Sequence, residues 1–294
     1  MEVDMSMPAT RSPGEVALPM TVAQLVQIIE QIAPPSLSEA WDNTGLLLGD
    51  LAAPVRRVMT CLTLTPESIQ EAILGAANLV LSHHPLPFKP LSRITTATSA
   101  GTGLWNLARH GIGIYSPHTA WDSAPDGINA QLARKLSLTD VEPLIPKLDH
   151  ELGSGRCGNL AQPLDIPAIA AKLARSVPHC RVRYVAPGRA IARVAIGCGS
   201  GGSFVAAAQE RRCDLLITGE ATFHQCLEAQ AAGLGLLMIG HFASEKFAME
   251  QLASRLANAL PSIDVWSSRQ ESDPVTNLPD PVAGLNADES SRPV

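Results

Sequence analysis

One pattern of strand, helix and strand occurs twice in the chain, and this duplication restricts the possible folds more than any other feature of the sequence. Residues 57–61 (RVMTC) precede a helical stretch and residues 77–82 (ANLVLS), and residues 193–198 (RVAIGC) precede a helical stretch and residues 213–218 (CDLLIT). Matching apolar positions of the two strands lie 23 residues apart in both copies. Chance similarity between apolar strands is the alternative explanation, but the shared spacing favours a duplicated βαβ module.

Each copy of this module continues into a further strand that leads to a histidine and, four residues later, to a carboxylate. The first copy reaches His118 and Asp122, and the second copy reaches His241 and Glu245. Open α/β sheets bind ligands beyond the carboxyl ends of their strands, where these residues fall. We therefore expect an α/β fold with two pseudo-symmetric α/β halves and a metal cleft between them.

The remaining apolar runs alternate with helical stretches, as expected for strand–helix–strand units around a sheet. A first helix begins at Thr21, which forms a capping box with Gln24. Strands are predicted at residues 45–48, 58–62, 79–82, 112–116, 194–197, 215–218, 236–239 and 263–266. Further helices are predicted around residues 67–77, 102–110, 127–136, 166–177, 204–211, 224–232 and 244–260.

Composition along the chain suggests how these elements group into domains. Residues 1–19 and 270–294 are rich in Pro, Asp, Ser or Asn and lack periodic apolar positions, so we expect two disordered tails. Between them we expect a first α/β half at residues 20–140 and a second at residues 191–269. Residues 141–190 are expected to form a linking segment with one helix.

Charge and cysteine usage exclude several classes of protein. The formal net charge is −6 and no run of Lys and Arg occurs, so the sequence gives no clear nucleic-acid signal, although a small anionic ligand remains compatible with a local metal. The six cysteines are scattered without a C-x-x-C motif, which indicates reduced thiols. No secretory signal or membrane-spanning run is recognisable, so we expect a cytoplasmic protein that does not enter the membrane.

The histidines and carboxylates at the strand ends predict a metal site. His83 and His84 follow an apolar strand, and two adjacent imidazoles that point in different directions suit two neighbouring metals better than one. A hydrogen-bonded, half-buried histidine is the alternative for any one of them. Imidazole and carboxylate without thiolate favour Zn, Fe, Mn, Ni or Co, and two such divalent ions could activate water for hydrolysis. The candidate set is His83, His84, His118, Asp122, His241 and Glu245.

Two features of the second module have competing explanations. The glycine-rich residues 197–203 could cradle a phosphate with backbone N–H groups, or could simply form a tight turn between strand and helix. Cys198 could be a nucleophile, but Cys61 lies within one residue of the matching place in the first copy, which favours a packing role for both.

Three further polar positions bear on the site. Glu220 occupies the repeat position of His84, and His224 follows four residues later. These two residues could orient metal ligands, or Glu220 could act as a general base. Residues 41–43 (WDN) are interpreted as a structural turn that closes over the site.

Several ordered motifs together resemble one known family. The dinuclear-metal proteins called GTP cyclohydrolase 1 type 2 homologues, or Ngg-one-interacting-factor-three-like and YbgI-like proteins, have similar blocks over roughly residues 20 to 268. The blocks are EAWDNTGLLLGD at 39–50, SHHPL at 82–86, FKP at 88–90, HTAWD at 118–122, TGE at 218–220 and GHFASE at 240–245. The resemblance implies two α/β halves, a metal pair between them and a toroidal homohexamer.

The resemblance also assigns roles residue by residue. The implied ligands are His83, His84, Asp122, His241 and Glu245, with His118 close to the metals. The third block departs from the commoner pattern of Asn and an aliphatic residue, which leaves the ligands intact but affects the pocket wall. Residues 142–190 are too few for the inserted domain of longer relatives.

These observations lead to two hypotheses about function. The first is a metal-dependent hydrolase that acts on a nucleotide-like small molecule, with Glu220 or His118 moving protons; the resemblance implies opening of the guanine imidazole ring of GTP with loss of formate. The second is a non-catalytic metal carrier, store or regulatory interaction protein. Ligand residues alone cannot distinguish catalysis from storage.

Overall fold

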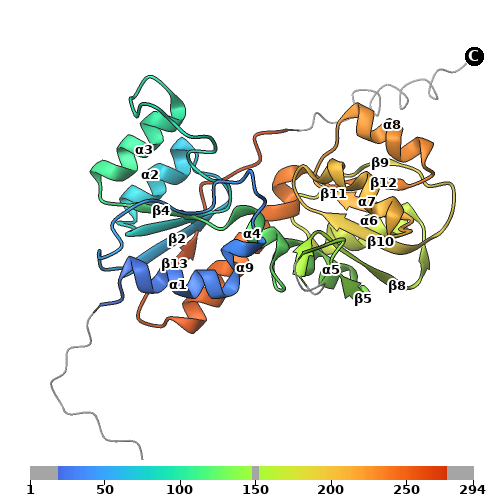
Figure 1. Cartoon of the computed structure of the whole chain (residues 1–294), viewed down its shortest axis with the longest axis horizontal. Coiled ribbons are helices and arrows are strands. Elements are labelled where there is room, and N and C mark those ends of the chain that lie inside the picture. The colour runs from blue at the N-terminus through green and yellow to red at the C-terminus, as the bar shows by residue number, and fades with distance from the viewer. Residues whose placement is uncertain (1–18, 148–151, 277–294) are drawn as a thin grey trace, which may run out of the picture.

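The computed structural model describes residues 19–147 and 152–276, which form two β-sheets with helices around each (Figure 1). The α/β class predicted from the sequence is confirmed. Within those ranges, no helix combines the length and apolar character needed to cross a bilayer. All six cysteines are free thiols. The expectation of disordered tails at residues 1–18 and 277–294 lies outside the described residues.

The first sheet contains the first copy of the module. Its strand order is β1 (Gly45–Leu48), β4 (Gly113–Ser116), β3 (Leu79–Ser82), β2 (Arg57–Cys61) and β13 (Asp264–Ser267). The last four strands are parallel, and β1 runs antiparallel to β4. The associated helices are α1 (Val22–Ile32), η1 (Pro35–Leu37), α2 (Pro66–Leu74) and α3 (Ser99–Arg109). The capping box predicted at Thr21 and Gln24 begins α1.

The second sheet contains the second copy. Its order is β5 (Thr139–Glu142), β8 (Arg156–Leu164), β10 (Ile191–Gly197), β11 (Leu215–Thr218), β12 (Gly235–Met238) and β9 (Arg183–Val185). The three central strands β10, β11 and β12 are parallel. Its helices are α5 (Ile128–Leu136), α6 (Ile166–Ser176), η2 (Gly201–Phe204), α7 (Val205–Glu210) and α8 (Phe223–Ala231). A short hairpin of β6 (Ile145–Lys147) and β7 (Leu152–Ser154) lies apart from both sheets.

Strand register supports the duplication inferred from the sequence. Val58 pairs with Leu79 between β2 and β3, and Val194 pairs with Leu215 between β10 and β11. The paired residues are 21 positions apart in both cases, and both pairs of strands are parallel. An antiparallel strand also lies beside the third strand of each module and precedes the module in the chain, since β1 pairs with β4 and β9 pairs with β12.

Pairing of the edge strands differs from the grouping expected from the sequence. The strand near the C-terminus, β13, pairs with β2 and so belongs to the first sheet, although the sequence grouped it with the second half. Residues 141–190, expected to form a linking segment with one helix, contain the end of β5 together with β8 and β9, which belong to the second sheet. A strand's apolar pattern shows that it is buried but does not show which sheet it joins.

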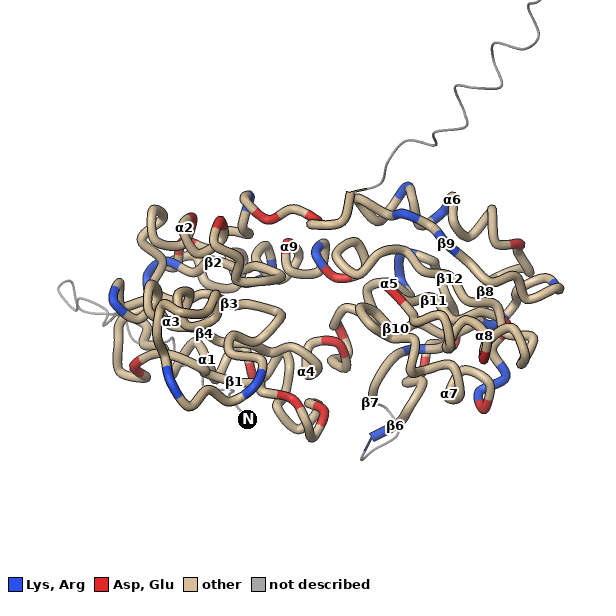
Figure 2. The backbone as a smooth tube through the Cα atoms, turned by 90° about the horizontal axis from the view of Figure 1, so that it is seen from above, with Lys and Arg blue, Asp and Glu red and all other residues tan. Residues whose placement is uncertain are grey.

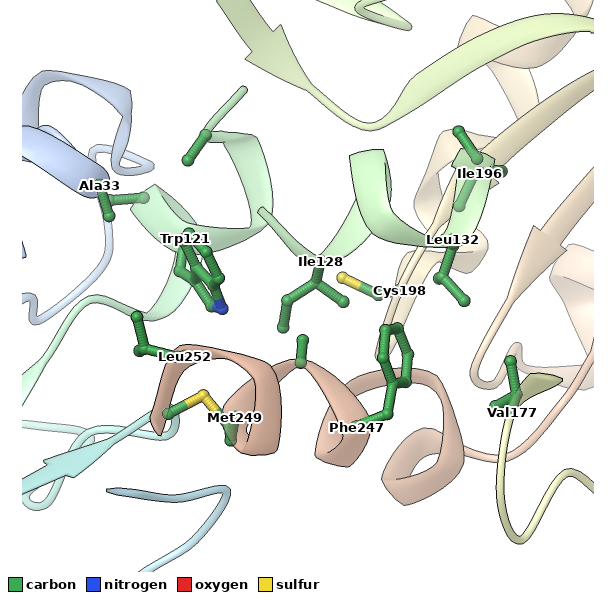
Figure 3. Close-up of a cluster of buried hydrophobic side chains, with 14 of the residues drawn as sticks. Ala33, Trp121, Ile128, Leu132, Val177, Ile196, Cys198, Phe247, Met249 and Leu252 are labelled. Atoms are coloured by element: carbon green, nitrogen blue, oxygen red, sulfur yellow. The ribbon is translucent and has the colours of Figure 1, made fainter. Parts of the chain in front are cut away.

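Helix α9 (His241–Ala259) connects the two sheets. It is 19 residues long, begins after β12 of the second sheet and leads into β13 of the first (Figures 1 and 2). Figure 3 shows its Phe247, Met249 and Leu252 facing Trp121 and Ile128 in one apolar core. All five side chains are buried. Because this core includes residues from both modules, burial of apolar area holds the two halves together.

The segment after β13 is anchored to the core, although its composition suggested a disordered tail from residue 270. The Glu271 side chain is only 2% exposed and forms an ion pair with Lys246, with 2.6 Å between Oε2 and Nζ. It also accepts hydrogen bonds from the backbone N–H groups of Leu62 (3.0 Å) and Thr63 (2.6 Å). The buried Glu271 carboxylate therefore helps to fix a segment whose polar composition is otherwise typical of disorder.

Substituting Glu271 tests this anchor. Glu271→Ala should lower the free energy of unfolding by about 3 to 5 kcal/mol, because Lys246 would stay buried without its partner. Urea denaturation measures the change. Asp273→Ala is the matched control, since that carboxylate accepts only a local hydrogen bond from Val275. Equal stability of the two variants would contradict the anchoring role.

Candidate metal centre

Three segments meet where the carboxyl ends of β3, β4 and β12 approach one another. His83 and His84 directly follow β3. His118 begins α4 (His118–Ser123) after β4, and Asp122 lies one turn later. His241 begins α9, and Glu245 again lies one turn later, so each helix presents a histidine and a carboxylate on one face.

The structure brings all six candidate residues into one cluster. Three overlapping groups have ligand atoms within 4.8 Å of one another: His83, His84 and His118; His84, His241 and Glu245; and His83, Asp122 and Glu245. Glu245 belongs to two of these groups. The pattern of histidine and carboxylate found twice in the sequence therefore converges in space.

Glu245 makes the closest contacts of the cluster. Its Oε2 lies 3.1 Å from Nε2 of His241 and 3.2 Å from Nε2 of His84. Its Oε1 lies 3.8 Å from Nε2 of His83, which is also 3.5 Å from Oδ1 of Asp122. The imidazoles of both modules thus surround a single carboxylate.

Several polar atoms of the cluster are buried without a hydrogen-bond partner. They include both ring nitrogens of His83, whose side chain is fully buried, and Oε2 of Glu245. Leaving such atoms unpaired costs free energy, so native proteins rarely tolerate several in one place. A cation coordinated by these atoms would satisfy them, and a set of imidazole and carboxylate ligands suits Zn, Fe, Mn, Ni or Co.

Electrostatic contacts shift the pKa values within the cluster in opposite directions. Burial opposes ionisation of Glu245, but the imidazoles of His241, His83 and His84 hold its pKa well below the ordinary value. Burial likewise opposes protonation of His241, yet the Glu245 and Glu220 carboxylates raise the pKa of this imidazole to about 9. Burial raises the pKa of Asp122, and His83 only partly offsets this effect. The cluster is therefore a dense arrangement of charges that proton uptake or metal binding would balance.

Three imidazoles are each contacted at Nδ1 by a side chain outside the cluster, so that their Nε2 atoms can face the cluster. In each, Nδ1 contacts an oxygen outside the cluster, which fixes the orientation of the ring. The contacts are Thr63 Oγ1 to His84 (2.7 Å), Asp42 Oδ1 to His118 (2.7 Å) and Glu220 Oε1 to His241 (3.0 Å).

Sequence reasoning singled out one of these three supporting oxygens, that of Glu220, as a group that could orient a ligand or act as a general base. Glu220 was a candidate for orienting a ligand, and its contact with His241 fits that alternative. Hydrogen bonds from Ser200 and His241 lower the pKa of Glu220, so it is a weaker base than an ordinary glutamate. Asp42 was interpreted only as part of a turn, and Thr63 was missed. Thr63 could have been identified from its position just after β2, next to the strand that the two histidines follow.

Asp42 is a buried carboxylate that fixes the turn next to the site. Burial opposes its ionisation, but contacts with His118 and Thr119 lower its pKa to about 2. Its second oxygen accepts hydrogen bonds from the backbone N–H and the hydroxyl of Thr119. The predicted turn is therefore also a direct support for His118.

The glycine-rich turn after β10 is explained by close packing. A Cβ atom at Gly199 would lie 2.2 Å from Oε1 of Glu245, and the residue has a positive φ of 58°. A Cβ atom at Gly202 would lie 2.3 Å from Oε1 of Gln225. These contacts favour the tight-turn alternative over a phosphate cradle, because the glycines make room for neighbouring side chains.

Cys198 and His224 do not have the roles of nucleophile and site residue. Cys198 is buried and donates its thiol to Oδ1 of Asp122 (3.1 Å). Burial and the nearby carboxylates raise its pKa well above the ordinary value, so it stays a thiol. His224 is exposed on α8 and does not line the cavity beside the cluster.

A cavity of about 590 Å³ opens beside the cluster. Its volume falls in the range typical of small-molecule sites. The wall combines five residues of the cluster, all except His83, with aromatic, hydroxyl and backbone groups from both halves. Among the lining residues are Trp41, Phe88, His118, Lys147, Ser200, Phe204 and Glu245.

The two-sheet fold and this cluster define an α/β protein with a candidate histidine–carboxylate metal centre beside a small-molecule cavity. The chain belongs to the Duf34/NIF3 (NGG1p interacting factor 3) family, whose model matches residues 20–274.

Similar proteins occur in bacteria and eukaryotes. A protein of Clostridium perfringens named GTP cyclohydrolase 1 type 2 homolog is 34% identical over 87% of this chain and 98% of its own length. NIF3-like protein 1 of Drosophila melanogaster is 30% identical over 87% of this chain and 89% of its own length. Among solved structures, a hypothetical protein of Staphylococcus aureus has a TM-score of 0.78 and 28% identity, covering 88% of this chain and all of the other.

Substitution of Gly199 tests whether its close approach to Glu245 matters. Gly199→Ala should weaken metal binding roughly 10- to 100-fold, because the added methyl group displaces a candidate ligand. Titration with Zn²⁺ followed by calorimetry measures the affinity. Gly111→Ala is the control, since Gly111 has a similar positive φ of 69° but nothing within 4 Å of an added Cβ. An unchanged Zn²⁺ affinity in Gly199→Ala would show that this turn does not affect the candidate metal ligands.

Proposed function

We propose that the protein is a dinuclear metal-dependent hydrolase that acts on a nucleotide-like small molecule. The observation that carries the proposal is the pair of donor groups that share Glu245 and lie beside a cavity of small-molecule size. The name GTP cyclohydrolase 1 type 2 homolog, borne by relatives at 34% and 33% identity, adds support. We also propose that six copies assemble into a toroid, as the family resemblance implies.

Two divalent transition-metal ions would use these donors. His83, Asp122 and Glu245 would hold one ion, and His84, His241 and Glu245 would hold the other. Such ions, when bound, would lower the pKa of water and stabilise negative charge that develops during hydrolysis. Three protein ligands for each ion leave positions free for substrate or water, as in catalytic rather than structural sites.

His118 is the residue that we propose to move protons. Its Nδ1 contacts Asp42, which holds the imidazole in one orientation. Its ring lies 5.1 Å from that of His83 and 5.7 Å from that of His84, so it is next to the candidate ligands and to the cavity. Glu220 would act through His241 as a positioning residue, or as an alternative proton carrier.

A metal carrier or a regulatory interaction protein is the second candidate function. The family description, NGG1p interacting factor 3, refers to an interaction and not to a reaction. The same donors would serve such a protein. Metal content and turnover together separate the two functions.

The metal stoichiometry should be about two ions per chain in the parent protein. His84→Ala and Glu245→Ala should each lower it without unfolding the chain, because each removes a donor. Elemental analysis of purified protein measures the content, and circular dichroism checks the fold. His224→Ala, which removes an exposed histidine outside the cluster, is the control. Unchanged stoichiometry in both ligand variants would remove these residues from the site.

Turnover distinguishes the hydrolase from the carrier. His118→Gln should keep the metal content and reduce nucleotide hydrolysis by about 10² to 10⁴-fold, the usual effect of losing a general acid or base. Glu220→Gln should have a smaller effect, since the amide oxygen can still accept a hydrogen bond from His241. The rates of nucleotide hydrolysis by the parent protein and by both variants are measured on metal-loaded preparations with matched metal content. Absence of nucleotide hydrolysis by the fully loaded parent protein would favour the carrier.

A further inference from the structure

Two aromatic side chains in the cavity wall are exposed to an unusual degree. Trp41 is 65% exposed and Phe88 is 52% exposed, and both line the cavity beside the metal centre. Their ring centroids are 6.2 Å apart and their planes are inclined by 45°, so the two rings form an open aromatic corner. Rings exposed to this extent add little burial energy to the fold, so their placement calls for another explanation.

The segments that carry the two rings are held rigidly. The Asn43 side chain donates a hydrogen bond to the backbone carbonyl of Pro87 (2.7 Å), which ties the turn of Trp41 to the loop of Phe88. Between Trp41 and Asn43, the buried Asp42 is bound by Thr119 and His118. The aromatic corner is therefore fixed in place before any ligand arrives, which reduces the entropy lost on binding.

The aromatic corner is next to the reactive groups. The centroids of Trp41 and Phe88 lie each 6.1 Å from that of His118. The His118 ring lies between this corner and the imidazoles of His83 and His84. A planar ring packed against Trp41 and Phe88 would therefore lie beside His118, which is itself next to the candidate metal ligands.

Charge at the cavity rim does not provide a competing basis for recognition. Lys147 lines the cavity, but its ammonium group is already bound by the Glu39 carboxylate (2.9 Å) and the Leu37 carbonyl (2.9 Å). Glu39 in turn accepts a hydrogen bond from Ser154 (2.6 Å). The Lys147 ammonium is therefore already paired, whereas the Trp41 and Phe88 side chains are exposed at the cavity wall.

We propose that Trp41 and Phe88 bind the planar heterocyclic base of the substrate and present it to the metal centre. The inference rests on the proposed function, which supplies a nucleotide-like substrate, and extends it by assigning the site of base recognition. Stacking on aromatic side chains tolerates different bases, so these residues would select for a ring and not for one particular base.

Binding of guanosine 5′-monophosphate, compared with ribose 5-phosphate, tests this assignment. The two probes share sugar and phosphate, and only the first has a base. With the metal-loaded full chain, the nucleotide should bind more tightly, and Trp41→Ala should weaken its binding about 5- to 150-fold. Trp41→Phe should retain most of the affinity, and Phe88→Ala should weaken binding in the same direction. None of these variants should affect ribose 5-phosphate.

Trp105→Ala is the matched control, because Trp105 is 51% exposed on α3 and does not line this cavity. Calorimetry gives the affinities, and thermal unfolding checks that each variant is folded. Equal affinity of the parent for both probes would overturn the proposal, as would an unchanged nucleotide affinity in Trp41→Ala. Binding that depends on Trp41 without any turnover would support base recognition and count only against the hydrolase.

Discussion

The buried carboxylate of Glu245 is the interaction on which the arrangement of the candidate metal ligands depends. It lies in the first turn of α9, which packs across both sheets, and it faces imidazoles that follow strands of both modules. A carboxylate removed from water needs compensating positive charge, which these imidazoles or a bound cation would provide. The apolar contacts of α9 then hold the halves at the separation that this cluster requires.

The duplicated module explains why the chemistry collects at this point. His84 and Glu220 occupy matching positions after β3 and β11, and α4 and α9 begin at the second and third residue after β4 and β12, respectively. The copies have since diverged in length and role. α4 ends after 6 residues, whereas α9 continues for 19 residues and leaves its own half. The two copies of the module therefore contribute unequally to the site. Both supply candidate ligands, and the second copy also supplies the helix that connects the two sheets.

Local patterns made much of the fold and cluster predictable. Apolar alternation located the central strands, and the spacing of histidine and carboxylate located His118, Asp122, His241 and Glu245. Long-range choices were not encoded locally: the partner of β13 depends on where α9 ends, and β8 joins a sheet through pairing with β10. Asp42, Thr63 and Glu271 likewise gain their roles only from partners brought together by folding.

The placement of β13 has a consequence for the synthesis of the protein. Because β13 completes the first sheet and follows α9, the first half begins near the amino end of the chain and is finished by nearly the last residues described. The second half is, in effect, inserted within the first. A nascent chain that has emerged only to β12 therefore lacks an edge strand of the first sheet, together with His241 and Glu245. Synthesis of α9 and β13 therefore completes both the first sheet and the candidate metal centre, and a chain that ended at β12 would have neither of them complete.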